Sequence, residues 1–464
     1  MANIILWNSF NVNYSPIRTI SCYQLASWLR QHGYTAVVLD FGHLMGADQL
    51  AAVTEKYIGP DTLAVGVSTN FWTSEVDYGM TAAEPEWVRL AREIVERRNP
   101  SVKWILGGNF VYSPNLQMSW RIFKWHAEDE LLKWMDENSS KLMRRELFDI
   151  TNSTQYFHSS DFIQPKEVLP IELGRGCQFK CRFCSYPLIG KKKGTYLRQF
   201  DHIRESFIRN YNEWGTTKYY FLDDTVNESD EKVQALAEIV QALPFELTWV
   251  GYNRLDLIGS KPETIKWLKD SGLKSPFFGI ESFNPDASKI TGKGWIGKHG
   301  KDFLLRLKEK WGKDVNWQLS FIVGLPGETR EDIQSTVEWC IKNDMYDWFF
   351  HPLTINRNPD KTWKSEFALN YKDYGYSFIE EDNLYNYYWK NDYWTYHDVR
   401  KYAEELNLLS NDYVKPSCWF LNSIASLGHS YEIMHILKKD LPRFLYRKET
   451  GEFVKKYVSL HLQG

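Results

Sequence analysis

The chain has 464 residues, with 56 Lys and Arg against 59 Asp and Glu and a formal net charge of -3. A chain of this length is too long to fold around one small hydrophobic core, which predicts two or three domains. Because positive and negative charges nearly balance, the protein as a whole lacks the positive electrostatic field that attracts nucleic acid. No apolar run reaches the roughly 18 residues of a membrane span, and MANIILWNSF at the start does not resemble a signal peptide. We therefore expect a cytoplasmic protein without a membrane span.

The N-terminal part alternates apolar runs with helical patterns. Helical patterns occur in SCYQLASWLRQHG, near 47–57 and in EPEWVRLAREIVERR, and the strand candidates are 3–9, 35–41, 61–69 and 102–108. Strands separated by single helices predict an α/β domain with a doubly wound parallel sheet. We assign it to residues 1–137, and the polar stretch at 138–165 to a linker.

A second alternating series predicts a partial (β/α)6 barrel at 166–354. Its strand candidates are 168–174, 218–224, 245–252, 275–282, 315–324 and 346–353. Ligands of such folds bind at the carboxyl ends of the strands, and each unusual motif of this half lies at such an end. Residues 355–464 are rich in Tyr, Trp and Asn and then helical in pattern. We expect a mostly helical, aromatic-rich region that covers the open mouth of the barrel.

Three of the six cysteines, Cys177, Cys181 and Cys184, lie within eight positions directly after a predicted strand. Six cysteines in so long a chain do not make a disulfide framework. Thiolates in a CxxxCxxC loop suit iron–sulfur or zinc. Structural zinc normally has four ligands, and neither His158 nor His202 is at ligand spacing. Three thiolates would leave one iron of a four-iron cluster open to a substrate or cofactor.

The other three cysteines, Cys22, Cys340 and Cys418, show no ligand spacing, and we expect ordinary packed thiols. A structural zinc or buried thiols are the alternatives for the clustered three.

The cysteine loop resembles the signature of the radical S-adenosylmethionine (SAM) enzymes. The resemblance implies a [4Fe-4S] cluster, SAM held on the open iron by its amino and carboxylate groups, and cleavage of SAM to a 5'-deoxyadenosyl radical. It also implies SAM-binding roles for residues in family order: Phe183 at the adenine, Asp223 and Asp224 at the methionine amino group, Arg254 at the carboxylate, Glu281 and Ser282 at the ribose or methionine, and Gly324 in the adenine wall. Singly, each has a structural alternative, such as a turn, a surface ion pair or a helix cap at Thr329.

The N-terminal domain resembles the cobalamin-binding domain of one subgroup of these enzymes. The matching residues are Ser68 and Thr69 in VGVST, Gly107 and Gly108 in ILGGNF, and the acidic segment HAEDELLKWM. Paired glycines let a backbone approach a bulky nucleotide closely. The family's DxHxxG loop supplies a histidine ligand to cobalt, but the corresponding NSFNVNYSPIRT has no histidine. Cobalamin bound without a protein histidine and a domain that has lost the cofactor both stay open.

The resemblance implies a cobalamin-dependent methyltransferase that acts on an unactivated carbon. A cobalamin-free rearrangement, cyclisation or dehydrogenation is the alternative, and an iron–sulfur electron-transfer or binding protein is a third interpretation. An electron donor such as flavodoxin or ferredoxin would be a partner. The substrate, a small molecule or a peptide, is not identified by the sequence.

Two further groups of residues have both a functional and a structural interpretation. Aromatic residues beyond strand ends could face the barrel across the two domains or pack an ordinary interface: Trp7, Phe10, Phe71, Trp72 and Phe110. A basic run after the cysteines could meet an anionic substrate or form a solvated loop: Lys191, Lys192, Lys193 and Arg198.

Overall fold

The structure is a computed structural model of the whole chain. It describes residues 1–8, 16–69, 84–108, 121–123, 126–139, 147–155, 157–185, 196–355, 365–379, 388–413, 425–428 and 441–464, with the side chains of 260 and 441–446 left out. Phe10, Phe71, Trp72, Phe110, Lys191, Lys192, Lys193 and Cys418 lie outside these ranges.

A five-stranded parallel sheet forms the N-terminal part, in the order β2-β1-β3-β4-β5. Its strands are β1 (Ile4–Trp7), β2 (Ala36–Leu39), β3 (Ala64–Ser68), β4 (Lys103–Gly107) and β5 (Arg121–Phe123). The predicted doubly wound sheet is confirmed, and β5 is an addition that the sequence did not predict. Because β1 lies between β2 and β3, the strand order reverses there, and the carboxyl ends of β1 and β3 flank the crevice where such sheets bind ligands.

Alternate side chains of this sheet enter two different cores. One core includes Leu6 and the helices α1 (Ile20–Gln31) and α4 (Glu128–Glu137), and it continues into the barrel. The other includes Trp7 and the helices α2 (Ala47–Tyr57), α3 (Glu86–Arg98) and α15 (Leu441–Gln463). The period of two residues along a strand produces this division.

The indole Nε1 of Trp7 donates a hydrogen bond to Thr54 Oγ1 at 2.9 Å. Trp7 therefore packs against α2, which favours the packing interpretation over the one in which it faces the barrel.

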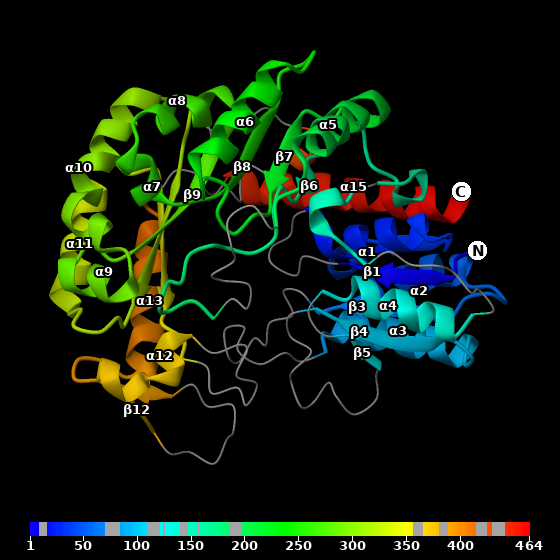
Figure 1. Cartoon of the computed structure of the whole chain (residues 1–464). Coiled ribbons are helices and arrows are strands. Elements are labelled where there is room, and N and C mark those ends of the chain that lie inside the picture. Colours follow the sequence, from blue (N-terminus) through cyan, green and yellow to red (C-terminus); the bar gives the residue numbers. More distant parts are fainter. Residues whose placement is uncertain are drawn as a thin grey trace.

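Six parallel strands form an open barrel in the order β11-β10-β9-β8-β7-β6. They are β6 (Leu169–Ile171), β7 (Lys218–Phe221), β8 (Thr248–Asn253), β9 (Leu273–Glu281), β10 (Gln318–Val323) and β11 (Asp347–Pro352). The intervening helices are α5 (Phe200–Trp214), α6 (Asp230–Gln241), α7 (Leu255–Ser260), α8 (Glu263–Asp270), α9 (Pro285–Thr291), α10 (Gly294–Trp311) and α11 (Arg330–Lys342). Each strand pairs with the next along the chain, and the helices cover the outer face (Figure 1). The predicted partial barrel is confirmed.

The described C-terminal segments lie on two different parts of the molecule. The helix α13 (Tyr396–Ser410) lies along β11, where the Asn407 side chain bonds both the N–H and the carbonyl of Phe350 at 2.8 Å. The short elements α12 (Glu366–Leu369), β12 (Ser377–Phe378) and β13 (Trp389–Lys390) precede it, and α15 contacts α2 of the N-terminal domain (Figure 1). These helices therefore cover the β11 edge and the N-terminal domain. That the region as a whole covers the barrel mouth stays a prediction.

A buried arginine joins the N-terminal domain to the rest of the chain. Arg18 and Glu167 are fully buried, with 2.6 Å between Arg18 Nε and Glu167 Oε1. The Arg18 guanidinium also donates to the carbonyl of Asp161 at 3.1 Å and lies 5.4 Å from the ring of Tyr457 in α15. Segments distant in sequence therefore share one buried charge pair.

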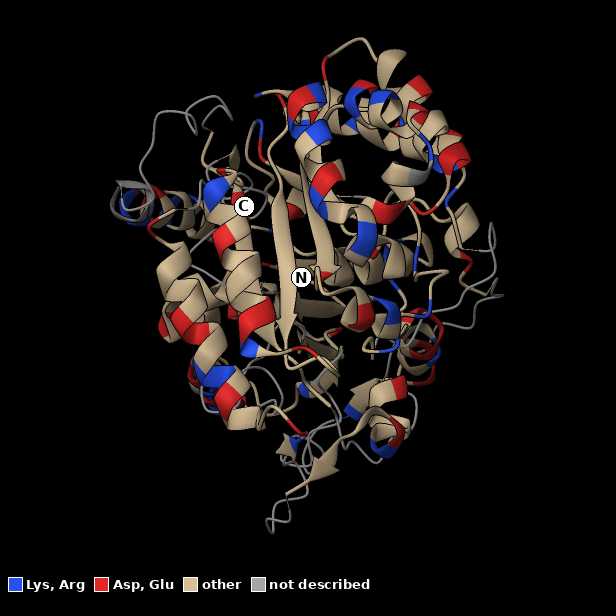
Figure 2. Cartoon of the chain, turned by 90° about the vertical axis from the view of Figure 1, so that its left-hand side faces the viewer, with Lys and Arg blue, Asp and Glu red and all other residues tan. Residues whose placement is uncertain are grey.

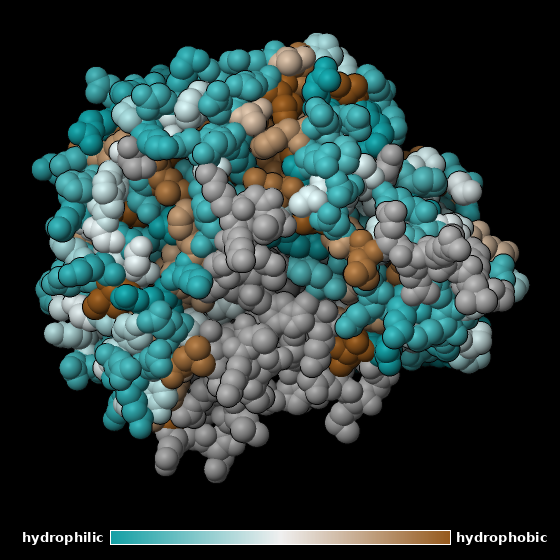
Figure 3. Space-filling view, in the orientation of Figure 1, coloured by the Kyte–Doolittle hydropathy of each residue, from teal (hydrophilic) through white to brown (hydrophobic). Residues whose placement is uncertain are grey.

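The outer helices carry mixed charges. On the side shown in Figure 2, blue Lys and Arg alternate with red Asp and Glu. On the face shown in Figure 3, which has the orientation of Figure 1, the described residues are mainly hydrophilic, and hydrophobic side chains gather in small separate groups. None of the helices in the described ranges has the length and apolar character to cross a membrane.

We expect Glu167→Gln to destabilise the protein by about 3–5 kcal/mol, because it leaves a buried guanidinium without its counter-charge. Urea unfolding followed by circular dichroism would measure this. The control is Glu93→Gln, which removes an exposed partner of Arg89 on α3 and should cost less than about 0.5 kcal/mol. Equal unfolding midpoints for the two variants would contradict a structural role for the buried pair.

Candidate functional site

The cysteine loop begins at the carboxyl end of β6. Gly176, directly before Cys177, has a φ of 93°, a conformation that favours glycine. The Leu173 N–H donates to Asp223 Oδ2 at 2.8 Å, and Gly174 forms a β-bridge with Leu197. These contacts fix the start of the loop against the end of β7.

A cavity of about 440 Å³ lies at the carboxyl ends of the barrel strands. The structure brings seven of the predicted site residues to its wall: Cys177, Cys181, Cys184, Phe183, Asp224, Arg254 and Glu281. Asp223, Ser282 and Gly324 do not line it. The predicted cluster and SAM residues are thus largely contiguous in space, although they come from four different strand ends.

The two aspartates after β7 have different surroundings. Asp223 is buried, and its carboxylate accepts from Lys232 Nζ at 2.7 Å, while Lys232 also bonds Glu228 at 2.8 Å. Asp224 faces the cavity, and burial, together with the neighbouring charge of Asp223, raises the pKa of its carboxyl group to about 7. Asp223 therefore supports the strand end, and Asp224 is the residue available to a ligand.

Arg254 lies beside a cysteine. Its guanidinium bonds both carboxylate oxygens of Asp256, and Nη1 is 3.3 Å from Cys181 Sγ. It also lies 4.1 Å from the ring of Phe179. If Arg254 also binds the SAM carboxylate, as predicted, its guanidinium must do so while it contacts Asp256 and the Cys181 thiol.

Glu281 ends β9 in a left-handed conformation with a φ of 64°, where the pairing of β9 with β10 shifts register. Lys293 Nζ bonds its carboxylate at 2.6 Å and the carbonyl of Gly279 at 2.7 Å. Lys293 also lines the cavity. Sequence reasoning missed Lys293, because no spacing relates it to the other motifs. A strained backbone held by a buried ion pair is a frequent feature of binding sites.

Ser282 and Gly324 have packing roles. The Ser282 hydroxyl donates to the buried carboxyl of Glu328. Gly324 has a φ of 99°, and an added Cβ would lie 2.6 Å from the ring of Trp389. Neither residue lines the cavity, and their implied roles, at the ribose or methionine for Ser282 and in the adenine wall for Gly324, stay predictions. Thr329 caps α11, as the structural alternative predicted.

The cysteines offer soft sulfur donors at one end of the cavity. Burial raises the pKa of the Cys177 thiol, whose Sγ is 3.6 Å from Thr225 Oγ1. In the described part of the chain, no three His, Cys, Asp or Glu side chains are close enough together to hold a single metal ion. Three thiols beside an open cavity fit a cluster with one iron left for a ligand.

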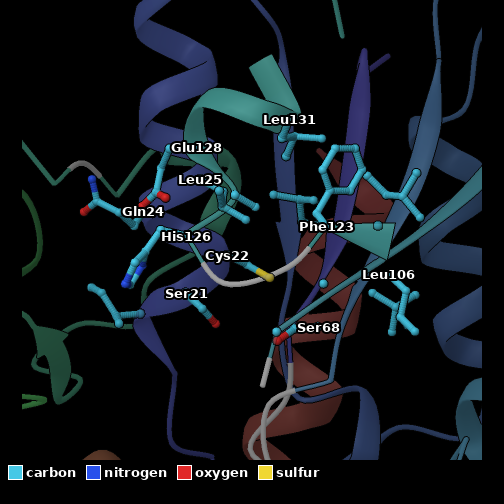
Figure 4. A pocket seen from close by; sticks show the side chains of 18 of the residues that line it. Ser21, Cys22, Gln24, Leu25, Ser68, Leu106, Phe123, His126, Glu128 and Leu131 are labelled. Atoms are coloured by element: carbon cyan, nitrogen blue, oxygen red, sulfur yellow. The ribbon is translucent and has the colours of Figure 1, made fainter. Parts of the chain in front are cut away.

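A second cavity, of about 200 Å³, lies at the carboxyl ends of β1, β3 and β4. Ser68, Gly107 and Gly108 line it, as the resemblance implies, and Gly108 has a φ of 113°. Thr69 does not line it, and its Oγ1 donates to the Gly107 carbonyl at 3.0 Å. Figure 4 shows Ser68 opposite Ser21, with Leu106 and Phe123 at one side and His126 beside Glu128. The cavity has an apolar wall and a polar rim.

The cysteine loop reaches this second cavity through Arg175. The guanidinium bonds Glu172 at 2.9 Å and Glu128 of α4 at 2.7 Å, and lies 3.0 Å from His126 Nδ1. Glu172 and Arg175 line the second cavity together with His126. The sequence analysis identified the segment that begins HAEDE as a match to the family, but it did not single out His126. One ion-pair network therefore joins the N-terminal cavity to the cysteine loop.

Arg198, the described member of the basic run, is buried. It donates to the carbonyls of Glu172 and Ser153 at 3.0 and 3.2 Å, and burial lowers the pKa of its guanidinium to about 10. The interpretation in which Arg198 contacts an anionic substrate is wrong, because its buried guanidinium binds these backbone carbonyls instead. Cys22 and Cys340 are buried thiols, as expected.

Residues 171–340 match the model of the radical SAM superfamily. This segment is a radical SAM domain. Uncharacterized methyltransferase PH0819 of Pyrococcus horikoshii is 31% identical over 198 residues, which are 42% of this chain and 41% of that protein. The chain therefore spans about two fifths of the length of this relative.

Two solved structures share the fold of most of the chain. TsrM from Kitasatospora setae, a radical SAM methyltransferase with cobalamin and a [4Fe-4S] cluster bound, has a TM-score of 0.62 and 16% identity, covering 82% of each chain. The cobalamin-dependent SAM radical enzyme OxsB has a TM-score of 0.51 and 16% identity, covering 80% of this chain and 56% of OxsB. At these identities the likeness shows a shared fold over about four fifths of this chain.

We expect Cys177→Ala, Cys181→Ala and Cys184→Ala each to lose the iron–sulfur cluster, because each removes one of three thiolate ligands. Iron and sulfide should fall from about four of each per chain towards zero after anaerobic reconstitution. Cys340→Ala, which alters a buried thiol in α11, should keep the cluster. Full iron content in any of the three variants would remove that cysteine from the ligand set.

Burial raises the pKa of Glu328 to about 8, well above its ordinary value. The folded state therefore keeps a proton that the unfolded state releases above about pH 4.5, so the stability from this group is lost as the pH rises through 8. We expect the unfolding free energy of the wild type to fall relative to Glu328→Gln by about 1 kcal/mol per pH unit between roughly pH 5 and 8. Urea titrations at several pH values would show it. Glu331→Gln, on the exposed side of α11, should give no such divergence.

Proposed function

We propose that this chain is a radical SAM methyltransferase that uses cobalamin to methylate an unactivated carbon. When bound, the cluster supplies an electron that splits SAM into methionine and a 5'-deoxyadenosyl radical, and cobalamin supplies the methyl group. The observation that carries the proposal is the pair of cavities joined by the loop at 172–184, one beside the three cysteines and one at the switch point of the N-terminal sheet.

The barrel cavity supports the SAM part of the proposal. Cys177, Cys181 and Cys184 would hold the cluster at the end where Arg254 supports the Cys181 thiol. Asp224 would accept from the methionine amino group, since its carboxyl faces the cavity. Glu281, fixed by Lys293, would meet the methionine or ribose, and Phe183 would contact the adenine.

The second cavity supports the cobalamin part. Gly107 and Gly108 expose backbone at a strand end, where a nucleotide tail could approach closely. Apolar side chains such as Leu106 and Phe123 would exclude water from that tail (Figure 4). The cavity of about 200 Å³ is smaller than a typical complete ligand site, so it fits one part of cobalamin.

The remaining parts of the proposal concern the domains and the surroundings of the protein. We place a cobalamin-binding domain at 1–137, a linker at 138–165, the SAM barrel at 166–354 and a C-terminal region at 355–464. We place the protein in the cytoplasm, where flavodoxin or ferredoxin could donate the electron.

Anaerobic reconstitution with iron, sulfide and cobalamin tests this function directly. We expect about one cobalamin per chain, release of 5'-deoxyadenosine with SAM and a reductant, and a cobalt(II) electron paramagnetic resonance spectrum without the nitrogen splitting of a histidine ligand. A His126→Ala variant with the same spectrum would confirm that His126 is not a cobalt ligand. Nitrogen splitting that disappears in this variant would contradict binding without a histidine.

Cleavage of SAM without cobalamin binding would support the alternative, a cobalamin-free rearrangement, cyclisation or dehydrogenation. Absence of cleavage with an intact cluster would support an electron-transfer or binding protein instead.

A further inference from the structure

The last strand of the barrel places one histidine in the cavity. Along β11, Trp348 and Phe350 are buried in the core beneath the helices, whereas Phe349 and His351 are exposed on the opposite face. The period of two residues along a strand directs that second face to the barrel interior. His351 lines the cavity that also contains the cysteines, and it pairs in register with Ile322 of β10.

The His351 ring has an aromatic neighbour and no hydrogen-bond partner among the described residues. Its centroid is 4.7 Å from that of Phe349. Partial desolvation in the cavity lowers the pKa of His351, so the imidazole is uncharged at neutral pH. A neutral imidazole has one N–H donor and one free acceptor nitrogen. An imidazole in a cavity with neither position used by the protein is available to a ligand.

The cavity is chemically divided. The charged lining residues lie near the cysteines and on the β7–β9 side: Asp224, Arg254, Glu281 and Lys293. Among the described lining residues, those on the β10–β11 side carry no charge apart from the titratable ring of His351: Ser320, Ile322, His351, Pro352, Leu353 and Thr354. The charged groups match the charged and polar parts of SAM, and the uncharged side is left for another molecule.

We propose that His351 binds the second substrate by accepting a hydrogen bond from an O–H or N–H group of an uncharged, mainly apolar molecule. The assignment rests on the proposed function, because it takes the charged side of the cavity as the SAM site. The described lining favours an uncharged substrate, since an ionised group would lose its hydration against Ile322 and Leu353 without a counter-charge from the described residues on that side. The aromatic rings of Tyr252 in β8 and Phe277 in β9, whose centroids are 4.9 Å apart, also line the cavity and favour a flat ligand.

Paired phenol probes test the contact without any turnover. Reconstituted protein with SAM and no reductant would be titrated with 4-methylphenol, which has a donor, and with 4-methylanisole, which has the same ring but no donor. We expect the wild type to bind the phenol about 2- to 10-fold more tightly, the effect of one net hydrogen bond. The preference should disappear in His351→Phe and persist partly in His351→Gln, which keeps an acceptor.

The matched control is His299→Phe, which changes an exposed histidine of α10 and should keep the preference. Unfolding midpoints and iron content would show that each variant is folded. Equal binding of both probes by the wild type, an unchanged preference in His351→Phe, or no saturable binding of either probe overturns the assignment. These outcomes are separate from SAM cleavage, so failure here and failure of the proposed function are distinguishable.

Discussion

The ion-pair network of Arg175 fixes the geometry on which the rest of the site depends. Its guanidinium bonds Glu172 in the cysteine loop and Glu128 at the start of α4, so that it ties the barrel to the N-terminal domain. A guanidinium between two carboxylates is a strong, directional connection. Because Arg175 lies two residues before Cys177, the position of the cysteines is coupled to the N-terminal cavity. The cysteine loop therefore fixes the position of one cavity relative to the other.

Buried ion pairs also fix side chains within the barrel. Lys232 forms ion pairs with the buried carboxylates of both Asp223 and Glu228, and Lys293 forms one with Glu281. Each of these three carboxylates has a cation, because an unpaired buried charge costs several kcal/mol. Asp224 differs from them, with no ion pair closer than 4 Å among the described residues. An unsatisfied carboxyl beside the cysteines is what a cationic amino group of a ligand would complement.

Sequence periodicity predicted the two sheets and the strand ends that carry the site. It could not predict which neighbours face the cavity, because Asp223 and Asp224, or Glu281 and Ser282, differ only in the direction of one side chain. The strand β5 was missed because it has only three residues. For Trp7 and Arg198 the sequence left two interpretations, because an aromatic ring or a cation near a strand end has the same sequence signal whether it packs inward or faces a ligand. Lys293 and His351 belong to no motif, and His126 was not singled out within HAEDELLKWM, so only the fold shows that these three residues line cavities.

The central claim is that three thiolates leave one iron open for SAM. Electron–nuclear double resonance of the reduced cluster, with SAM labelled with ¹⁵N at the methionine amino group, tests it most directly. The account predicts ¹⁵N hyperfine coupling in the wild type that is weakened or lost in Asp224→Ala, because the carboxyl orients the amino group. A wild-type cluster that is intact and shows no coupling to the labelled nitrogen would contradict it.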